Sequence, residues 1–182
     1  MPEPTDEFIL ALFANSKTKE QAFEMLLKKY QRLIYYNVRR IVTLHEDADD
    51  VTQNVSIKIW RHLDKFRGDA SLKTWITKIS VNEALTFVEK KKKLLNLTDD
   101  SYTDFLLVTQ PETNSYTPNE IEHMLQEAIL RLPPKQRAVF TMRYYDETPY
   151  AEMSKIFDTS ESALKASYHF AMEKIKKNLL EH

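Results

Sequence analysis

The sequence is poor in the residues that build disulfides, tight turns and strands. Its 182 residues include no cysteine and one glycine, Gly68. The missing cysteines exclude a disulfide framework and a thiolate metal site, and they fit the reducing cytoplasm, where we expect the protein to act. The single glycine and the few β-branched runs argue against a turn-rich all-β fold. Residues of high helix propensity dominate instead, and they predict an all-α protein.

Long apolar segments and a strong excess of one charge are also missing. No apolar run is long enough to span a bilayer, and the acidic start MPEPTDEFIL lacks the basic residues that open a signal peptide, so we expect no membrane insertion. The net charge of −1 is unusual for a protein that binds nucleic acid alone. The charges are segregated, however. EKKKKLL at 89–95 is basic and HEDADD at 45–50 is acidic, so one face could bind DNA and another a protein.

Helical periodicity divides the chain into three parts. Four amphipathic helices are expected within residues 1–93. Residues 94–116 are polar and show no sustained period, which predicts a linker. The helical signal resumes in residues 117–182, where Thr117 is a typical N-cap and Pro118 a typical first helical residue. We therefore expect two small helical domains joined by a polar linker.

The fourth helix of the first domain follows the segment that contains the glycine. Ser71 is the expected N-cap of this helix, and four apolar residues are expected to point inward. These residues are Leu72, Ile76, Ile79 and Leu85. The lysine-rich last turn of this helix suits the negative end of the helix dipole.

The last two expected helices are separated only by DTS, which makes them a candidate helix-turn-helix. A plain helical hairpin gives the same pattern and stays open as the alternative. One face of the last helix is apolar, and the opposite face carries Ser162, Lys165, Ala166, His169 and Phe170. An outward Phe beside small and polar groups suits a helix in the major groove of DNA. There Phe or Ala can touch thymine methyl groups, and Lys or Ser can reach base edges.

The acidic segment HEDADD raises the alternative of a metal-dependent enzyme that uses Asp47 and Asp49. The spacing fits neither an EF-hand, because Val51 occupies the fifth position, nor HExxH, because Asp49 replaces the second histidine. The sequence also lacks a Gly-rich phosphate loop and the G-x-S-x-G motif. A charged helix N-terminus explains the segment better. We expect no catalytic residues, metal or cofactor.

Two stretches resemble the bacterial sigma-70 family. HEDADDVTQNVSIKIWRHLDKFRGDASLKTWITKISVNEAL resembles sigma region 2, and LPPKQRAVFTMRYYDETPYAEMSKIFDTSESALKASYHFAMEKI resembles region 4. The two occur in order with a linker between them. The chain thereby resembles the extracytoplasmic-function (ECF) group of RNA polymerase sigma factors, in a variant common in Bacteroidetes. It departs from the family pattern at Asn54, where Glu is usual, and at Ser162, where Gly is usual. These departures bear on promoter preference.

The resemblance implies a polymerase-binding face on the third helix. In this family the β′ coiled coil of core RNA polymerase docks there, and the matching residues are Asp49, Asp50, Gln53 and Asn54. Their carboxylates and amides can accept hydrogen bonds from Arg and Lys. A solvated acidic face is the alternative. Residues 117–182 would bind the flexible flap of the β subunit and the −35 promoter element through the five outward residues of the last helix.

The resemblance also implies that the loop FRGDASLK and the helix after it bind the −10 element as single-stranded DNA. The residues concerned are Arg67, Gly68, Ser71, Lys73, Lys78, Asn82, Lys90 and Lys91. For Gly68 the alternative is a left-handed helix cap, and for the last two lysines a solvated helix end. The implied partners are core RNA polymerase, promoter DNA and an anti-sigma factor. A helix-turn-helix regulator that binds duplex DNA as a dimer without polymerase is the rival hypothesis.

Overall fold

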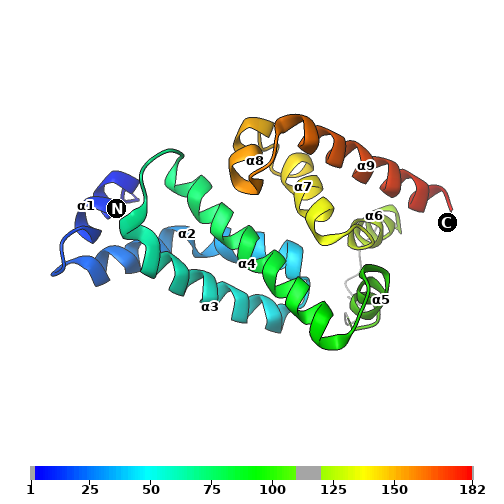
Figure 1. The fold of residues 1–182 in the computed structure, drawn as a ribbon, viewed down its shortest axis with the longest axis horizontal. Coiled ribbons are helices and arrows are strands. Elements are labelled where there is room, and N and C mark those ends of the chain that lie inside the picture. The colour runs from blue at the N-terminus through cyan, green and yellow to red at the C-terminus, as the bar shows by residue number, and fades with distance from the viewer. Residues whose placement is uncertain (1–2, 110–119, 182) are drawn as a thin grey trace.

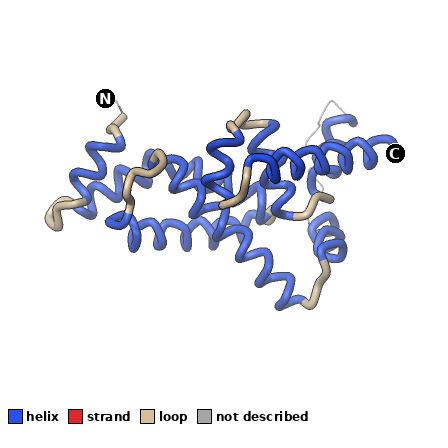
Figure 2. The backbone as a smooth tube through the Cα atoms, turned by 45° about the horizontal axis from the view of Figure 1, so that its top comes forward, coloured by secondary structure: helices blue, strands red, loops and turns tan. Residues whose placement is uncertain are grey.

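The computed structural model describes residues 3–109 and 120–181, and these residues form helices and connecting loops without a strand (Figure 2). The helices are α1 (Asp6–Phe13), α2 (Lys19–Val42), α3 (His45–His62), α4 (Leu72–Leu95), α5 (Asp99–Thr109), α6 (Glu120–Leu130), α7 (Pro134–Tyr144), α8 (Tyr150–Phe157) and α9 (Glu161–Leu180). A short 3-10 helix, Leu63–Lys65, extends α3. The prediction of an all-α protein is confirmed. Within the described residues, no helix is both long and apolar enough to cross a membrane.

The helices form two groups (Figure 1). Helices α1 to α4 make one bundle in which α2 packs against α1, α3 and α4. In the second group, α9 packs against α6, α7 and α8. Each group buries apolar side chains, such as Ile34 and Ile59 in the first and Phe140 and Ile175 in the second. This burial is the main source of stability in a helical protein without disulfides.

Side-chain caps start several of the described helices, α1, α4 and α9 among them. Thr5, Ser71 and Ser160 have extended backbones, and the hydroxyl of each accepts a hydrogen bond from the backbone N–H three residues later. These bonds satisfy donors that an α-helix leaves free in its first turn. The predicted cap at Ser71 is therefore confirmed. The predicted start at Thr117 and Pro118 lies outside the described residues.

The buried face of α4 differs in part from the prediction. Leu72 and Ile76 are buried as expected, but Ile79 and Leu85 are only half-buried. Small residues fill the interior positions instead, among them Ser80 and Ala84. The reason is that α4 is packed on several sides, by α2, α3, α7 and α8. Where these helices approach α4 closely, small side chains fit better than large apolar ones.

The segment between the two groups contains a helix that the sequence analysis did not predict. Helix α5 lies within residues 94–116, which were expected to be a polar linker without a period. Tyr102 and Leu106 lie one turn apart in α5, and both are buried. At the start of this helix, Asp99 forms an ion pair with Lys92, with an N–O distance of 2.5 Å. With two buried side chains in eleven residues, the apolar period is too short to stand out in the sequence. The division of the chain into domains at these residues stays a prediction.

The two groups share an extensive contact. Helix α7 packs against α2 and α4, and α8 packs against α4. Ala138, Val139 and Met142 of α7 belong to the same buried cluster as Ile41 of α2 and Val81 of α4. Across this contact, Arg40 forms a two-pronged ion pair with Asp146, with both N–O distances 2.6 Å. The second group is therefore held against the first by apolar burial and by ion pairs together.

Candidate protein- and DNA-binding surfaces

The first surface is an acidic face on α3. Asp49, Asp50, Gln53 and Asn54 are all exposed there, as predicted for residues that meet a partner. The spacing of α3 brings Asp49 and Asp50 within one turn of Gln53 and Asn54, so the four groups form a single patch. Asp49 lies 3.5 Å from the Nε2 atom of His45, one turn before it. The other three make no side-chain hydrogen bond or ion pair to any residue that the structure describes.

An apolar groove borders this acidic face. It lies between α2 and α3 and is lined by Phe23, Gln53, Ile57 and Trp60, with carboxylates of α2 at its edge. Ile57 is an exposed large apolar side chain, whereas Trp60 packs edge-on against Phe23 with ring centroids 5.0 Å apart. Exposed apolar area next to charged groups is the usual composition of a protein-binding surface.

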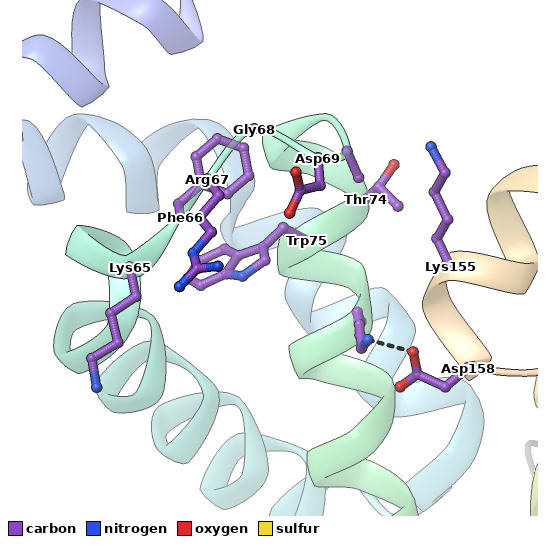
Figure 3. A pocket seen from close by; sticks show the side chains of 11 residues that line it. Lys65, Phe66, Arg67, Gly68, Asp69, Thr74, Trp75, Lys155 and Asp158 are labelled. Carbon is purple, nitrogen blue, oxygen red and sulfur yellow. Dashed lines mark hydrogen bonds and ion pairs between the residues drawn. The ribbon is translucent and has the colours of Figure 1, made fainter.

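The second surface is a cavity of about 440 Å³ at the start of α4, hereafter the first cavity. Arg67 and Gly68 form one side of it, and Trp75 and Lys78 of α4 form another. Figure 3 shows the Phe66 and Trp75 rings together beneath the loop, and their centroids lie 5.7 Å apart at an interplanar angle of 64°. Trp75 thus packs on the core and also forms an aromatic wall. A cavity with an aromatic wall and basic groups at its rim can hold an unstacked base and its phosphate.

Gly68 lies at the tip of the loop in a left-handed conformation, with φ of 78°. A Cβ atom built on it would meet no other atom within 4 Å. Glycine is therefore required by the backbone conformation and not by close packing within the protein. Gly68 is exposed and lines the cavity, so a strand of DNA could pass close to its backbone.

The other residues predicted to bind the −10 element lie along α4 with different surroundings. The hydroxyl of Ser71 caps the helix and accepts the Thr74 N–H at 3.1 Å. Lys73, Asn82 and Lys90 are exposed, but only Arg67, Gly68 and Lys78 of the predicted set line the cavity. Lys91 is partly buried in an ion pair with Asp47, so its charge is already neutralised.

Helix α8 of the second group covers one edge of this cavity. Lys78 forms an ion pair with Asp158 at 2.6 Å, marked in Figure 3, and Lys155 also lines the cavity. The Thr74 hydroxyl donates a hydrogen bond to Glu152 Oε1 at 3.0 Å. No local pattern in the sequence predicts these contacts, because the partners are about 80 residues apart. In this arrangement Lys78 and the Thr74 hydroxyl of α4 already have partners at α8.

The third surface is the outward face of α9. Ser162, Lys165, Ala166, His169 and Phe170 are all exposed, as predicted, and Phe170 is 58% exposed. The opposite face buries Leu164, Ala171 and Ile175 against α6, α7 and α8. The five exposed residues form a continuous strip of small, basic and apolar groups along α9. Such groups can contact the edges of DNA bases.

The turn before α9 is built without glycine. Asp158 takes the left-handed conformation, with φ of 48°, and its backbone N–H bonds the carbonyl of Ser154. Asp and Asn tolerate this conformation better than other residues with a Cβ. Ser160 then starts α9. The helix-turn-helix predicted from the sequence therefore has a tight turn, with Asp158 in the position where glycine is common.

The acidic segment at the start of α3 does not gather into a metal site. Within the described residues, no three His, Cys, Asp or Glu side chains are close enough together to hold a metal ion. Asp47 pairs with Lys91, and Asp49 lies near His45, so the two carboxylates proposed for an enzyme face different partners.

Sequence comparisons connect these surfaces to known proteins. The family model described as Sigma-70 region 2 matches residues 26–94, which hold the acidic face and most of the residues that line the first cavity. The model described as Sigma-70, region 4, matches residues 122–175, which hold the helix-turn-helix. The two matches occur in the order of the family and take in more than half of the chain. The chain belongs to the sigma-70 family of RNA polymerase sigma factors.

Full-length relatives place this sigma factor in the ECF group. It is 25% identical over 177 residues to the ECF RNA polymerase sigma factor SigW of Bacillus subtilis, with 90% of this chain and 91% of the relative covered. It is 29% identical over 168 residues to the ECF RNA polymerase sigma-E factor of Escherichia coli K12, with 87% of each chain covered. These relatives do not favour a regulator that binds duplex DNA without polymerase or a metal-dependent enzyme.

Solved structures confirm the fold of the sigma factor. The sigma factor RpoE from Bartonella quintana, in complex with the anti-sigma factor NepR, aligns with a TM-score of 0.63 at 17% identity and covers 86% of this chain and 96% of its own. CnrH in complex with the cytosolic domain of CnrY also aligns with a TM-score of 0.63 at 17% identity, and 96% of each chain is covered. The two helical groups of the present sigma factor are regions 2 and 4 of this fold.

Proposed function

We propose that this sigma factor binds core RNA polymerase through the acidic face of α3 and directs it to promoters through α4 and α9. The observation that carries the proposal is the presence, in one chain, of two surfaces that suit different forms of DNA. One is a loop with a cavity at the start of α4, and the other is an exposed recognition helix. A protein that reads only duplex DNA has no use for the first element.

The polymerase contact would centre on Asp49, Asp50, Gln53 and Asn54. All four are exposed, so docking on the β′ coiled coil needs no rearrangement of α3. Guanidinium and ammonium groups of the partner would bind the carboxylates, and the neighbouring groove with Ile57 would add apolar contact. Region 4 would bind the flap of the β subunit.

The −10 element would be bound as single-stranded DNA at the first cavity. An unstacked base would lie against Trp75, and Arg67 and Lys78 would meet phosphates. Ser71 would keep its role as the cap of α4, while Lys73, Asn82 and Lys90 would extend the contact along the exposed side of the helix. Lys91 would take part only after it releases Asp47.

The −35 element would be bound as duplex DNA by Ser162, Lys165, Ala166, His169 and Phe170 of α9. Phe170 and Ala166 would touch thymine methyl groups, and Lys165 would reach a phosphate or a base edge. The chain's near-neutral charge suits this division of labour, because polymerase supplies much of the affinity for DNA.

Promoter binding by α4 competes with the contact between α4 and α8. Lys78 cannot fully engage a phosphate while it is paired with Asp158, and Glu152 occupies the Thr74 hydroxyl. We therefore infer that α8 leaves α4 when the sigma factor binds polymerase and promoter. An anti-sigma factor would act in the opposite sense by favouring the closed arrangement. The setting for both is the cytoplasm, and the chain would belong to a Bacteroidetes-like variant of its group.

Paired variants test the division of roles. Asp50→Arg should abolish co-purification with core polymerase, because it reverses the charge that a basic partner needs. His169→Ala should leave co-purification unchanged and should weaken initiation that depends on the −35 element. The assignment fails if the two variants lose polymerase binding to the same degree, since both residues would then serve the fold or one common contact.

A further inference from the structure

A second cavity, of about 460 Å³, lies where α2 meets α6 and α7, away from the acidic face and from the first cavity. Arg39, Arg40 and Arg137 line it, together with tyrosine, threonine and glutamine side chains. None of the residues that line it within the described chain is an Asp or Glu. Like charges in a partly buried site repel each other, and among the described residues only Arg40 of these three arginines has a carboxylate partner, Asp146.

Arg137 supplies a positive charge at the base of the cavity. Its side chain is 2% exposed, and its two terminal nitrogens donate to the carbonyl oxygens of Ile41 at 2.6 Å and Leu130 at 3.1 Å. The Nε atom is buried without a hydrogen-bond partner among the described residues. Burial lowers the pKa of the guanidinium to about 10, so it stays protonated near neutral pH. A buried charge with two carbonyls and no counterion gains from an anion nearby.

Thr43 gives a second, independent observation. This β-branched residue has φ of 76° and ψ of −48°, and the N–H of Leu44 donates to the carbonyl of Val42 at 3.0 Å around it. This is a strained γ-turn, and strained backbone concentrates at sites that bind ligands. Thr43 is buried, lines the cavity, and its hydroxyl has no partner among the described residues.

The rim of the cavity holds one arginine that is free to bind. Arg40 is already committed, because it pairs with Asp146 and its guanidinium lies 3.6 Å from the Tyr36 ring centroid. Arg39 makes no side-chain hydrogen bond or ion pair to any residue in the described part of the chain. Tyr145, half of whose side chain is buried, stands on the α7 side of the cavity.

We propose that this cavity is a binding site for a small phosphorylated molecule of about nucleotide size. A planar guanidinium matches the oxygens of a phosphate group, which favours Arg39 as the direct ligand above the uncompensated charge of Arg137. The cavity volume falls within the range of small-molecule sites. Tyr145 gives an aromatic surface on which a base could stack.

The position of the site links ligand binding to the arrangement of the two helical groups. Arg39 lies on α2 and Thr43 directly follows this helix, whereas Gln126 lies on α6 and Tyr145 at the end of α7. A ligand that contacts both sides binds the closed arrangement better than an open one. By mass action it then increases the closed population, in which α8 contacts α4. Binding itself is independent of the proposed function, because it is measured without polymerase or DNA.

Calorimetry on the full-length chain tests the site, with inorganic pyrophosphate and GDP as probes and sulfate at matched ionic strength as the comparison anion. Arg39→Gln should weaken binding of both phosphorylated probes by about tenfold or more, since it removes a charge-assisted contact. Arg32→Gln, an exposed arginine on the same helix, is the matched control and should bind like the unmodified chain. The proposal is overturned if neither probe binds, if sulfate binds as tightly as pyrophosphate, or if Arg39→Gln keeps full affinity.

Spin labels test the effect on closure. The chain has no cysteine, so Lys65→Cys and Lys155→Cys give a unique labelled pair on opposite sides of the first cavity. Pyrophosphate should increase the fraction of short label-to-label distances, and the increase should be absent with Arg39→Gln. A distance distribution that pyrophosphate leaves unchanged, or that it broadens toward longer distances, would show that the ligand does not hold the two groups together.

Discussion

The contact between Lys78 and Asp158 offers a direct way to loosen α8 from α4. The substitution Asp158→Asn removes the negative charge of the ion pair. Asp158 has φ of 48°, and Asn tolerates this left-handed conformation as well as Asp does, so the turn before α9 is preserved. We expect the variant to fold normally and to expose Lys78 more often.

The structure sets the size of the effect. The side chains of Lys78 and Asp158 are 35% and 69% exposed, and such a surface ion pair contributes about 0.2–1 kcal/mol. Since 1.4 kcal/mol is a factor of ten, the closed population should fall relative to the open one by about 1.4- to 5-fold. The buried contact of Ala138 and Met142 with the first bundle remains, so Asp158→Asn loosens the arrangement without abolishing it.

The assay is the affinity of the free sigma factor for a single-stranded oligonucleotide with its −10 element, followed by fluorescence anisotropy. Asp158→Asn should bind about 1.4- to 5-fold more tightly than the unmodified chain, in line with the shift in population. Glu122→Gln makes the same change in charge on an exposed position of region 4 and serves as the control for general attraction to DNA. The reasoning is refuted if the two variants gain affinity equally or if Asp158→Asn gains none.

Three further predictions concern single residues. Gly68→Val should lower the free energy of unfolding by about 1–2 kcal/mol in chemical denaturation, because φ is 78°, and Gly68→Asn should lower it less; equal losses would show that the conformation is not the cause. Arg137→Lys should lower the free energy of unfolding by about 1–3 kcal/mol in the same measurement. The planar guanidinium of Arg137 reaches the carbonyls of both Leu130 and Ile41, and a single ammonium cannot. An unchanged denaturation midpoint would contradict this. Phe170→Ala should reduce −35-dependent initiation about fivefold or more without loss of polymerase binding, whereas the exposed Leu180→Ala on the same helix should not.

Features that depend on neighbouring residues were predictable from the sequence. The cap at Ser71 follows from a hydroxyl placed before a helical period. The exposed face of α9 follows from helical geometry alone, because its opposite face carries the apolar residues.

Features that depend on distant packing were not predictable. The burial of Ser80 and Ala84 reflects how closely other helices approach α4, which no period of α4 itself reveals. The pairing of Lys78 with Asp158 joins residues 80 positions apart. The positive φ of Thr43 runs against the preference of β-branched residues, so only the surrounding structure accounts for it.

The most direct measurement of the central claim is run-off transcription with core RNA polymerase, the purified sigma factor and genomic DNA fragments, with the start sites sequenced. We predict initiation at defined start sites that share a −10 and a −35 element and that disappear when the sigma factor is omitted. The absence of any sigma-dependent start site, with polymerase that remains active with another sigma factor, would contradict the account.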